Sequence, residues 1–132
     1  MIENEVKSLE IKTYTGLKRI VYAGKNSYMG MRYNLLNDAA FRQEVILAAI
    51  LIPVAVLLDL GPLETVALIV AVLFVLIVEL LNTAVEATVD RIGKDYHELS
   101  GLAKDTGSAA VTLSLIVCVL VWGGVITSRY WA

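Results

Sequence analysis

The chain has 132 residues, of which 58% are hydrophobic and 18% charged, and its mean hydropathy is +0.71. A water-soluble domain of this length could not bury so much apolar surface, so the composition favours a membrane protein with a single domain. The net charge of −2 points to no charged partner, and no nucleic-acid partner is expected. The one cysteine, Cys118, lies in an apolar run, which excludes an intrachain disulfide and a cysteine-based zinc site and indicates a packing residue.

Composition divides the chain into six segments. Residues 1–14 are a polar leader with three glutamates and without the apolar core of a cleavable signal peptide. Residues 15–37 are predicted to form an amphipathic surface helix. The remaining predicted segments are a first span at 39–60, a second span at 63–90, a cytoplasmic connection at 91–107 and a third span at 108–128.

The predicted surface helix carries an apolar stripe beside a basic line. The stripe recurs at helical spacing and consists of Leu17, Ile20, Val21, Gly24, Tyr28, Met31 and Leu35. The basic line, at intervals of seven, is Lys18, Lys25 and Arg32. This pattern favours a helix that lies on an anionic membrane leaflet with its cations extended to lipid phosphates. The alternative is an ordinary helix packed against other protein.

Positive charges predict the orientation of the spans. Seven Lys or Arg residues lie before the first span or at its interfacial start, the turn between the first two spans has none, the connection before the third span has three, and one follows that span. Because cytoplasmic loops carry the excess of Lys and Arg, the N-terminus is predicted to be cytoplasmic and the C-terminus outside. Trp122, Tyr130 and Trp131 suit an interfacial aromatic belt at the outer end.

Four polar side chains recur on the second span at intervals of three, four and four: Glu79, Asn82, Glu86 and Asp90. At about 100° per residue they share a narrow sector of the helix, and at about 1.5 Å per residue they extend over roughly 16 Å. Glu79 follows fourteen residues without a charge, and an ionisable group within a membrane costs about 2.5–3.5 kcal/mol. That cost favours a function for Glu79 over pairing with a cation, whereas Asp90 is explained equally well by an ion pair or by exposure.

Carboxylates grouped at a cytoplasmic membrane face favour a hard cation, and Mg²⁺ held by one or two carboxylates plus substrate phosphates fits best. A further carboxylate in a poorly hydrated place binds its proton more tightly and is a better base for a hydroxyl proton. Lys104 and Ser108 share one helix face, where the lysine could hold phosphate oxygens or extend to the interface. His97 stands alone, as a loop residue or a nucleotide contact, so a histidine-based metal site is unsupported.

The sequence contains no G-x-x-x-x-G-K-[ST], no G-x-G-x-x-G and no H-E-x-x-H motif. If ATP is a substrate, it is therefore bound without a standard nucleotide fold. Three helices per chain cannot screen several carboxylates from lipid on every side, so a homo-oligomer is expected.

Five runs of residues carry a resemblance to a known family. They are Ala39-Ala40-Phe41-Arg42-Gln43-Glu44, VELLNTAVEATVDRIG from Val78 to Gly93, YHELSG from Tyr96 to Gly101, AKD from Ala103 to Asp105, and GSAAV from Gly107 to Val111. Together they resemble the prokaryotic diacylglycerol kinase family, from about Arg19 to the third span, and the long central run is highly specific. The resemblance implies an all-α, homotrimeric enzyme of the bacterial inner membrane that transfers the γ-phosphate of ATP, with Mg²⁺, to diacylglycerol and gives phosphatidic acid.

The resemblance also implies roles for single residues. Glu79 matches the catalytic general base that takes the proton of the lipid hydroxyl, and Asn82 matches a polar residue beside that base. Asp38 and Glu86 match the carboxylates that hold the metal. The implied ATP-binding and metal-binding residues are Arg19, Asn26, Asp38, Glu86, Asp95, Tyr96, His97, Lys104 and Asp105. The implied lipid site is lined by Arg19, Arg32, Arg42, Glu44, Glu79 and Ser108. In this family each site is shared between neighbouring subunits.

Two positions depart from the family pattern. Asp38 stands where Glu, one methylene longer, is usual, and Asn26 stands where an aromatic residue is common. A sister group phosphorylates undecaprenol on the same scaffold. Its motif before the third span differs from YHELSGLAKDTGSAA, which favours diacylglycerol as the substrate.

Two interpretations come from other classes of protein. Charged residues in spans often mark ion paths, so a small ion or proton translocator is one alternative. Such a path should cross the membrane, yet the first and third spans contribute no charge at mid-membrane. A purely structural membrane subunit is the other alternative, and it leaves Glu79 unexplained.

Overall fold

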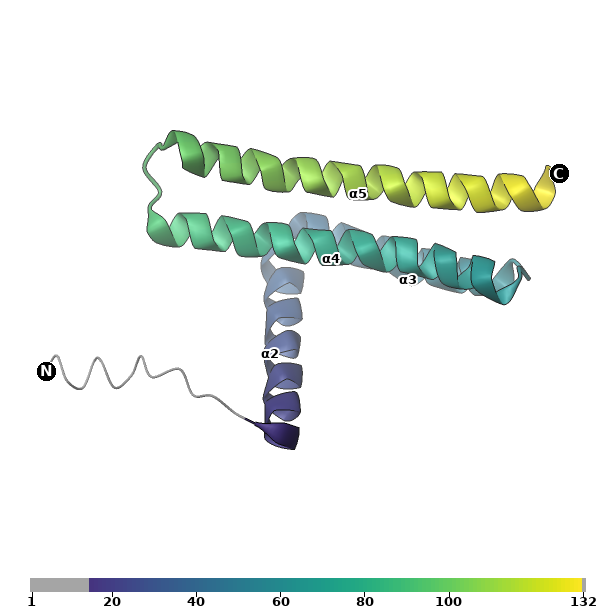
Figure 1. Ribbon diagram of the computed structural model, residues 1–132, viewed down its shortest axis with the longest axis horizontal. Helices are drawn as coiled ribbons and strands as arrows, with labels where there is room; N and C mark the ends of the chain where they lie inside the picture. Colours follow the sequence, from purple (N-terminus) through teal and green to yellow (C-terminus); the bar gives the residue numbers. More distant parts are fainter. Residues whose placement is uncertain (1–14, 132) are drawn as a thin grey trace, which may run out of the picture. The chain divides into compact units, whose positions relative to one another are not determined.

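A computed structural model describes residues 15–131, and the predicted leader at 1–14 lies outside these described residues. The described chain forms helices and no strand: α2 (Gly16–Asn37), α3 (Ala39–Leu57), α4 (Pro62–Ile92) and α5 (Glu98–Tyr130). Figure 1 shows these elements in chain order. The predicted all-α architecture is confirmed. Two compact units are distinguished, one ending at Tyr33 and one beginning at Asn34.

The first unit contains most of α2. This helix begins at Gly16, directly after a threonine, and Gly16 has a φ of +65°. Only glycine adopts such a positive φ without steric cost, so Gly16 suits the start of the helix. The apolar residues of the predicted stripe, such as Leu17, Ile20 and Val21, are exposed. An amphipathic helix on a lipid surface would present such a stripe, and that role of α2 stays a prediction.

The second unit contains the three apolar helices α3, α4 and α5, each long and hydrophobic enough to cross a bilayer. The most apolar windows of the three helices have mean hydropathies of 1.9, 2.7 and 2.5. α3 continues through Pro53 without interruption. Three long apolar helices are thus confirmed.

α4 is the central helix, because it packs against both α3 and α5. Figure 1 shows α4 and α5 running side by side in opposite directions. The buried side chains are mostly small or β-branched, which lets helix backbones approach closely. They include Ala48 and Ala55 of α3, Ala71, Val72 and Val75 of α4, and Ser114 of α5, beside the larger Phe41 and Leu68.

The turn between α3 and α4 is tied to the last turns of α5. Asp59 adopts a φ of +52°, which Asp tolerates better than most residues, and Pro62 occupies the first turn of α4. Tyr130 donates its hydroxyl to the Leu58 carbonyl at 3.4 Å, and Arg129 Nη2 lies 3.5 Å from the Asp59 carbonyl oxygen. These contacts hold one end of the helix bundle together.

Most of the predicted cytoplasmic connection at 91–107 is helical. α4 continues to Ile92 and α5 begins at Glu98, so residues 93–97 form the segment between the two helices. His97 caps α5, because its Nδ1 accepts a hydrogen bond from the Leu99 backbone N–H at 3.1 Å. Histidine is not among the usual N-cap residues, so the sequence alone showed no sign of this cap.

We expect Trp122→Phe to lower the free energy of unfolding by about 0.5–1.5 kcal/mol, because the Trp122 indole N–H donates to the Leu68 carbonyl at 3.1 Å and phenylalanine has no donor. Denaturation in detergent micelles, followed by helical circular dichroism, measures this loss. The control is Trp131→Phe, since Trp131 is 85% exposed. An equal loss in both variants would contradict a stabilising role for the hydrogen bond.

Candidate active site

The four polar positions of α4 do share one face. Glu79 is only 5% exposed, and Asn82 Nδ2 lies 3.5 Å from Glu86 Oε1, one helical turn away. Residues four apart on a helix lie one above the other, which explains the contact. The predicted polar face is therefore present, with its most deeply placed acid enclosed by the protein and Glu86 exposed.

Asp38 brings a second carboxylate to this face from the start of α3. Its Oδ1 accepts hydrogen bonds from the backbone N–H groups of Ala40 and Phe41, at 3.0 and 3.2 Å, so Asp38 is the N-cap of α3. Its Oδ2 accepts from the Thr83 hydroxyl at 3.1 Å. Aspartate is among the best N-cap residues. The cap is therefore a physical reason for Asp at a position where the resembled family usually has Glu.

Glu44 adds a further carboxylate from α3. Its Oε2 is buried without a hydrogen-bond partner. Glu44 lines a small cavity of about 40 Å³ with apolar side chains from α3, α4 and α5. Its charge interacts with those of Glu79 and Asp38, and Glu79 also interacts with Asp38 and Glu86. Here this group of Asp38, Glu44, Glu79 and Glu86 is called the acidic cluster.

Lys104 is paired with Asp90 instead of reaching the acidic cluster. Its Nζ lies 2.7 Å from Asp90 Oδ1, and both side chains are about half exposed. The ion pair joins the end of α4 to the start of α5, and it supports the structural interpretation of Asp90. Solvent screens such exposed pairs, so they contribute little to stability and an incoming anion can compete for the lysine.

The predicted nucleotide segment lines a hollow at the same end of α4 and α5. Asp95, Tyr96 and His97 surround it together with residues of both helices, and its volume is about 480 Å³. Tyr96 is 94% exposed, so its ring is open to a ligand. Asp105 and Ser108 lie on α5 close to Lys104, and both are exposed.

Arg42 has a local structural contact. Its Nη1 donates to the backbone carbonyls of Leu35 and Leu36, each at 3.1 Å. These carbonyls belong to the last turn of α2, where no helical partner is available, so Arg42 caps the C-terminal end of that helix. The side chain is exposed. The predicted lipid contact of Arg42 therefore has a capping role beside it.

Three predicted site residues lie in the first unit. Arg19, Asn26 and Arg32 are all exposed on α2. Their contacts with nucleotide or lipid stay predictions, as do the binding roles of the acidic cluster.

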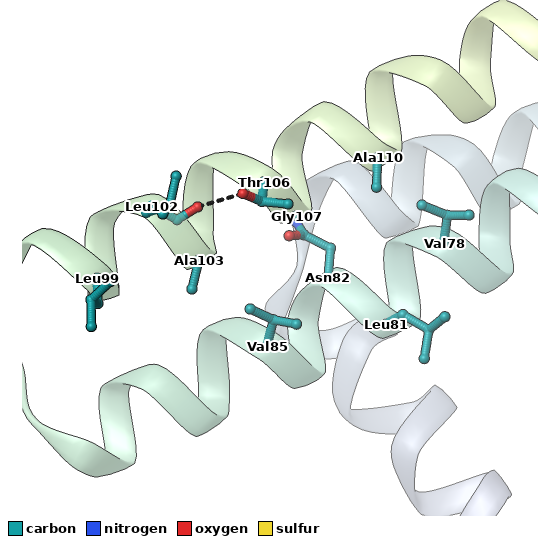
Figure 2. Close-up of a pocket in the computed structure, with 10 residues that line it drawn as sticks. All are labelled: Val78, Leu81, Asn82, Val85, Leu99, Leu102, Ala103, Thr106, Gly107 and Ala110. Atoms are coloured by element: carbon teal, nitrogen blue, oxygen red, sulfur yellow. Dashed lines mark hydrogen bonds between the residues drawn. The ribbon is translucent and has the colours of Figure 1, made fainter.

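An apolar groove runs between α4 and α5, with a volume of about 550 Å³. Figure 2 shows its lining, in which Asn82 extends from α4 toward Gly107 of α5. Leu99, Leu102 and Ala103 line the groove from α5. Asn82 is the polar side chain of the α4 face that meets this apolar surface.

Sequence reasoning missed Thr83 and the packing role of Gly107. Thr83 lies four residues after Glu79 and thus within the same sector of α4, a signal that was available from spacing. Gly107 carried no comparable signal, because its role depends on how closely α5 approaches Asn82.

No group of three or more His, Cys, Asp or Glu side chains is placed to hold a metal ion within residues 15–131. Mg²⁺ does not need such a cage, because it is usually bound through one or two carboxylates plus substrate phosphates. Asp38 accepts three hydrogen bonds within the protein, and its carboxyl group also lies within hydrogen-bonding reach of Glu79. Carboxylate oxygens are ligands that Mg²⁺ prefers, and the exposed Glu86 carboxylate is open to such an ion.

Comparison with known proteins gives a consistent result. The model of the family described as prokaryotic diacylglycerol kinase matches residues 25–126. A diacylglycerol kinase of Escherichia coli strain K12 is 50% identical over 108 residues, 82% of this chain and 88% of that protein. Those of Pseudomonas aeruginosa and Haemophilus influenzae are 48% and 46% identical, over 87% and 85% of this chain and 94% and 95% of their own lengths.

We expect Thr83→Val to lower the free energy of unfolding by about 1 kcal/mol, because the variant keeps the shape of threonine but removes the donor to Asp38 Oδ2. Chemical denaturation in micelles measures the change. Thr88→Val is the matched control, since the exposed Thr88 hydroxyl donates only to the Ala84 carbonyl of its own helix. If the two variants lose the same stability, the bond between α3 and α4 contributes nothing of its own.

Proposed function

Because this chain belongs to the prokaryotic diacylglycerol kinase family, we propose that it transfers the γ-phosphate of ATP to the hydroxyl of diacylglycerol with Glu79 as the general base. The chain is a membrane lipid kinase, and the product of this transfer is phosphatidic acid. Phosphoryl transfer depends mainly on positioning and charge stabilisation, so a set of side chains on few helices suffices for it.

The buried carboxylate of Glu79 is the observation that carries the base assignment. Glu79 is 5% exposed and lies where the long apolar stretch of α4 ends and the polar face of that helix begins. We propose that a membrane-dissolved alcohol reaches this carboxylate from the bilayer. Glu79 would take the hydroxyl proton as the alcohol oxygen bonds to the γ-phosphorus and the bond to the bridging oxygen of ADP breaks.

Asp38 and Glu86 are the proposed ligands of Mg²⁺. Asp38 lies beside the Thr83 hydroxyl and the Glu79 carboxyl group, and Glu86 is exposed next to the Asn82 carboxamide. When bound, the cation supplies positive charge to the ATP phosphates. The protein residues orient the two carboxylates: the N-cap of α3 holds Asp38, and Asn82 holds Glu86.

ATP is proposed to bind beside the connection between α4 and α5. The hollow lined by Asp95, Tyr96 and His97 provides room for the nucleotide. Lys104 and Asp105 lie further along the chain, near the start of α5. Lys104 would exchange its exposed Asp90 partner for phosphate oxygens. Arg19 and Asn26 of α2 are proposed to contribute from the surface helix. Asn26 supplies a carboxamide at its position, without a ring for stacking.

The lipid headgroup is proposed to bind near the ends of α2 and α3. Arg32 and Arg42 are exposed cations, and Ser108 is an exposed hydroxyl on α5. Glu44 has a buried oxygen without a partner, which can accept a hydrogen bond from a glycerol hydroxyl. Arg19 is the remaining residue of this proposed set.

We further propose a homotrimer in the bacterial inner membrane, with a cytoplasmic N-terminus, an external C-terminus and active sites shared between subunits. Only 6% of the apolar window of α5 is buried within one chain, so most of this helix faces lipid or other subunits. Asn82 and Glu86 belong to the exposed or half-buried part of α4, where another subunit could complete the site. A fully active monomer in sedimentation experiments would contradict this assembly.

The two alternative functions are not favoured. The named relatives are diacylglycerol kinases, not undecaprenol kinases. An ion translocator needs polar groups across the bilayer, yet the acidic cluster of α3 and α4 lies toward one end of the bundle, far from the turn between α3 and α4.

We expect Glu79→Gln to lower kcat for diacylglycerol by about a hundred- to ten-thousandfold, because the amide keeps the size of the side chain and cannot accept the proton. Labelled ATP and separation of the lipid products measure the rate, with diacylglycerol and undecaprenol assayed side by side. Glu64→Gln, an acid in the first turn of α4, is the control. A Glu79→Gln variant that retains most of its activity would remove Glu79 from the role of base.

Glu86→Gln is expected to raise the Mg²⁺ concentration needed for half-maximal activity by about tenfold or more, since even indirect partners of a metal contribute about 10- to 100-fold in affinity. Activity measured over a magnesium titration gives this concentration. The control Glu98→Gln changes an acid in the first turn of α5 and should leave the titration unchanged. Identical titrations for both variants would argue against Glu86 as a ligand.

A further inference from the structure

α5 comes close to the Asn82 side chain of α4 at Gly107. A Cβ placed on Gly107 would overlap Asn82 Oδ1 and would lie 3.3 Å from Asn82 Cγ. Figure 2 shows the Asn82 side chain directed at this part of α5. Among the glycines of residues 15–131, Gly107 is the only one at which an added Cβ would meet another group within 4 Å. The backbone of Gly107 is ordinary helix, so its conformation does not require a glycine. Glycine is needed at this position because any side chain would collide with Asn82.

The orientation of the Asn82 carboxamide depends on this contact. Its Oδ1 is buried at the interface and has no hydrogen-bond partner. Its Nδ2 points along α4 to Glu86 Oε1 at 3.5 Å. A carboxamide has two ends, and an arrangement with Oδ1 toward Glu86 would place two acceptors together. The space over Gly107 lets the oxygen lie against α5 and leaves the nitrogen for the carboxylate.

We propose that Gly107 is a positioning residue, which fixes the Asn82 carboxamide and through it the carboxylate of Glu86. This inference rests on the proposed function, in which Glu86 holds the cation of the ATP phosphates. A methyl group at position 107 would push the carboxamide off α5 and turn Nδ2 away from Glu86. The chain would still fold as three helices, but the acid would be oriented less well.

The test is Gly107→Ala in the full chain. Because a displacement of about 1 Å costs on the order of a hundredfold in rate, kcat should fall by about tenfold to a hundredfold. The Mg²⁺ concentration needed for half-maximal activity should rise as well, because Glu86 holds the cation in the proposed function. Gly101→Ala is the matched control: it lies on the same helix, is half-buried like Gly107, and its added Cβ meets nothing within 4 Å. Gly101→Ala should keep the wild-type kcat.

A double variant separates positioning from general packing. In the Asn82→Ala background the carboxamide is absent, so Gly107→Ala should cause no further loss of kcat. If the loss from Gly107→Ala is as large in that background as in the wild type, Gly107 acts through helix packing and the proposal is overturned. If Gly107→Ala fails to fold, recovery of the fold by Asn82→Ala supports the contact, and lack of recovery overturns it.

A spectroscopic measurement reads the contact without using activity. In ¹⁵N spectra of the protein in micelles, the Asn82 side-chain amide is the pair of signals lost in Asn82→Ala. These signals should shift in Gly107→Ala and stay in place in Gly101→Ala. Unchanged signals in Gly107→Ala would refute the proposal. If the wild-type chain phosphorylated no lipid, the proposed function would fail, while these signals would still decide the contact.

Discussion

Glu79 is a carboxyl group enclosed by the protein at the end of a long apolar stretch of α4, and the neighbouring elements are arranged around it. An ionisable group inside a membrane is costly, so it persists only where protein contacts or function compensate. α3 approaches on the side of Thr83, where Asp38 accepts the threonine hydroxyl. α5 approaches on the side of Asn82, where Gly107 leaves space for the carboxamide. Glu79 lies on the sector between these two contacts, with little of its surface exposed.

Several residues of this site combine a structural contact with a proposed chemical role. Asp38, a proposed ligand of the cation, caps α3, and Arg42 caps the end of α2. His97 caps α5 at the edge of the hollow proposed for ATP. A helix end carries unsatisfied backbone groups, so a polar residue there is held in a defined orientation. In a small membrane protein with few loops, helix ends are thus one of the places where polar side chains can be held in a defined orientation.

The two ends of the bundle differ in chemistry. At one end, aromatic and arginine side chains of α5 hydrogen-bond to backbone carbonyls around the turn between α3 and α4. At the other end lie the acidic cluster, the Asp90–Lys104 pair and the hollow beside Tyr96. The apolar contacts between α4 and its neighbours link the two ends. A kinase that takes its lipid from the bilayer and its nucleotide from water needs ionisable groups at only one end of its helix bundle.

Periodicity and composition alone determined the three apolar helices, the acidic sector of α4 and the start of α3 at Ala39, because these depend on local spacing along one helix. The family followed from long specific runs such as VELLNTAVEATVDRIG. The tertiary structure decided the partners: Thr83 for Asp38, Lys104 for Asp90, and Gly107 against Asn82. Each of these contacts joins two helices far apart in sequence, and their closeness depends on how small side chains let the helices pack, which spacing along a single helix does not contain.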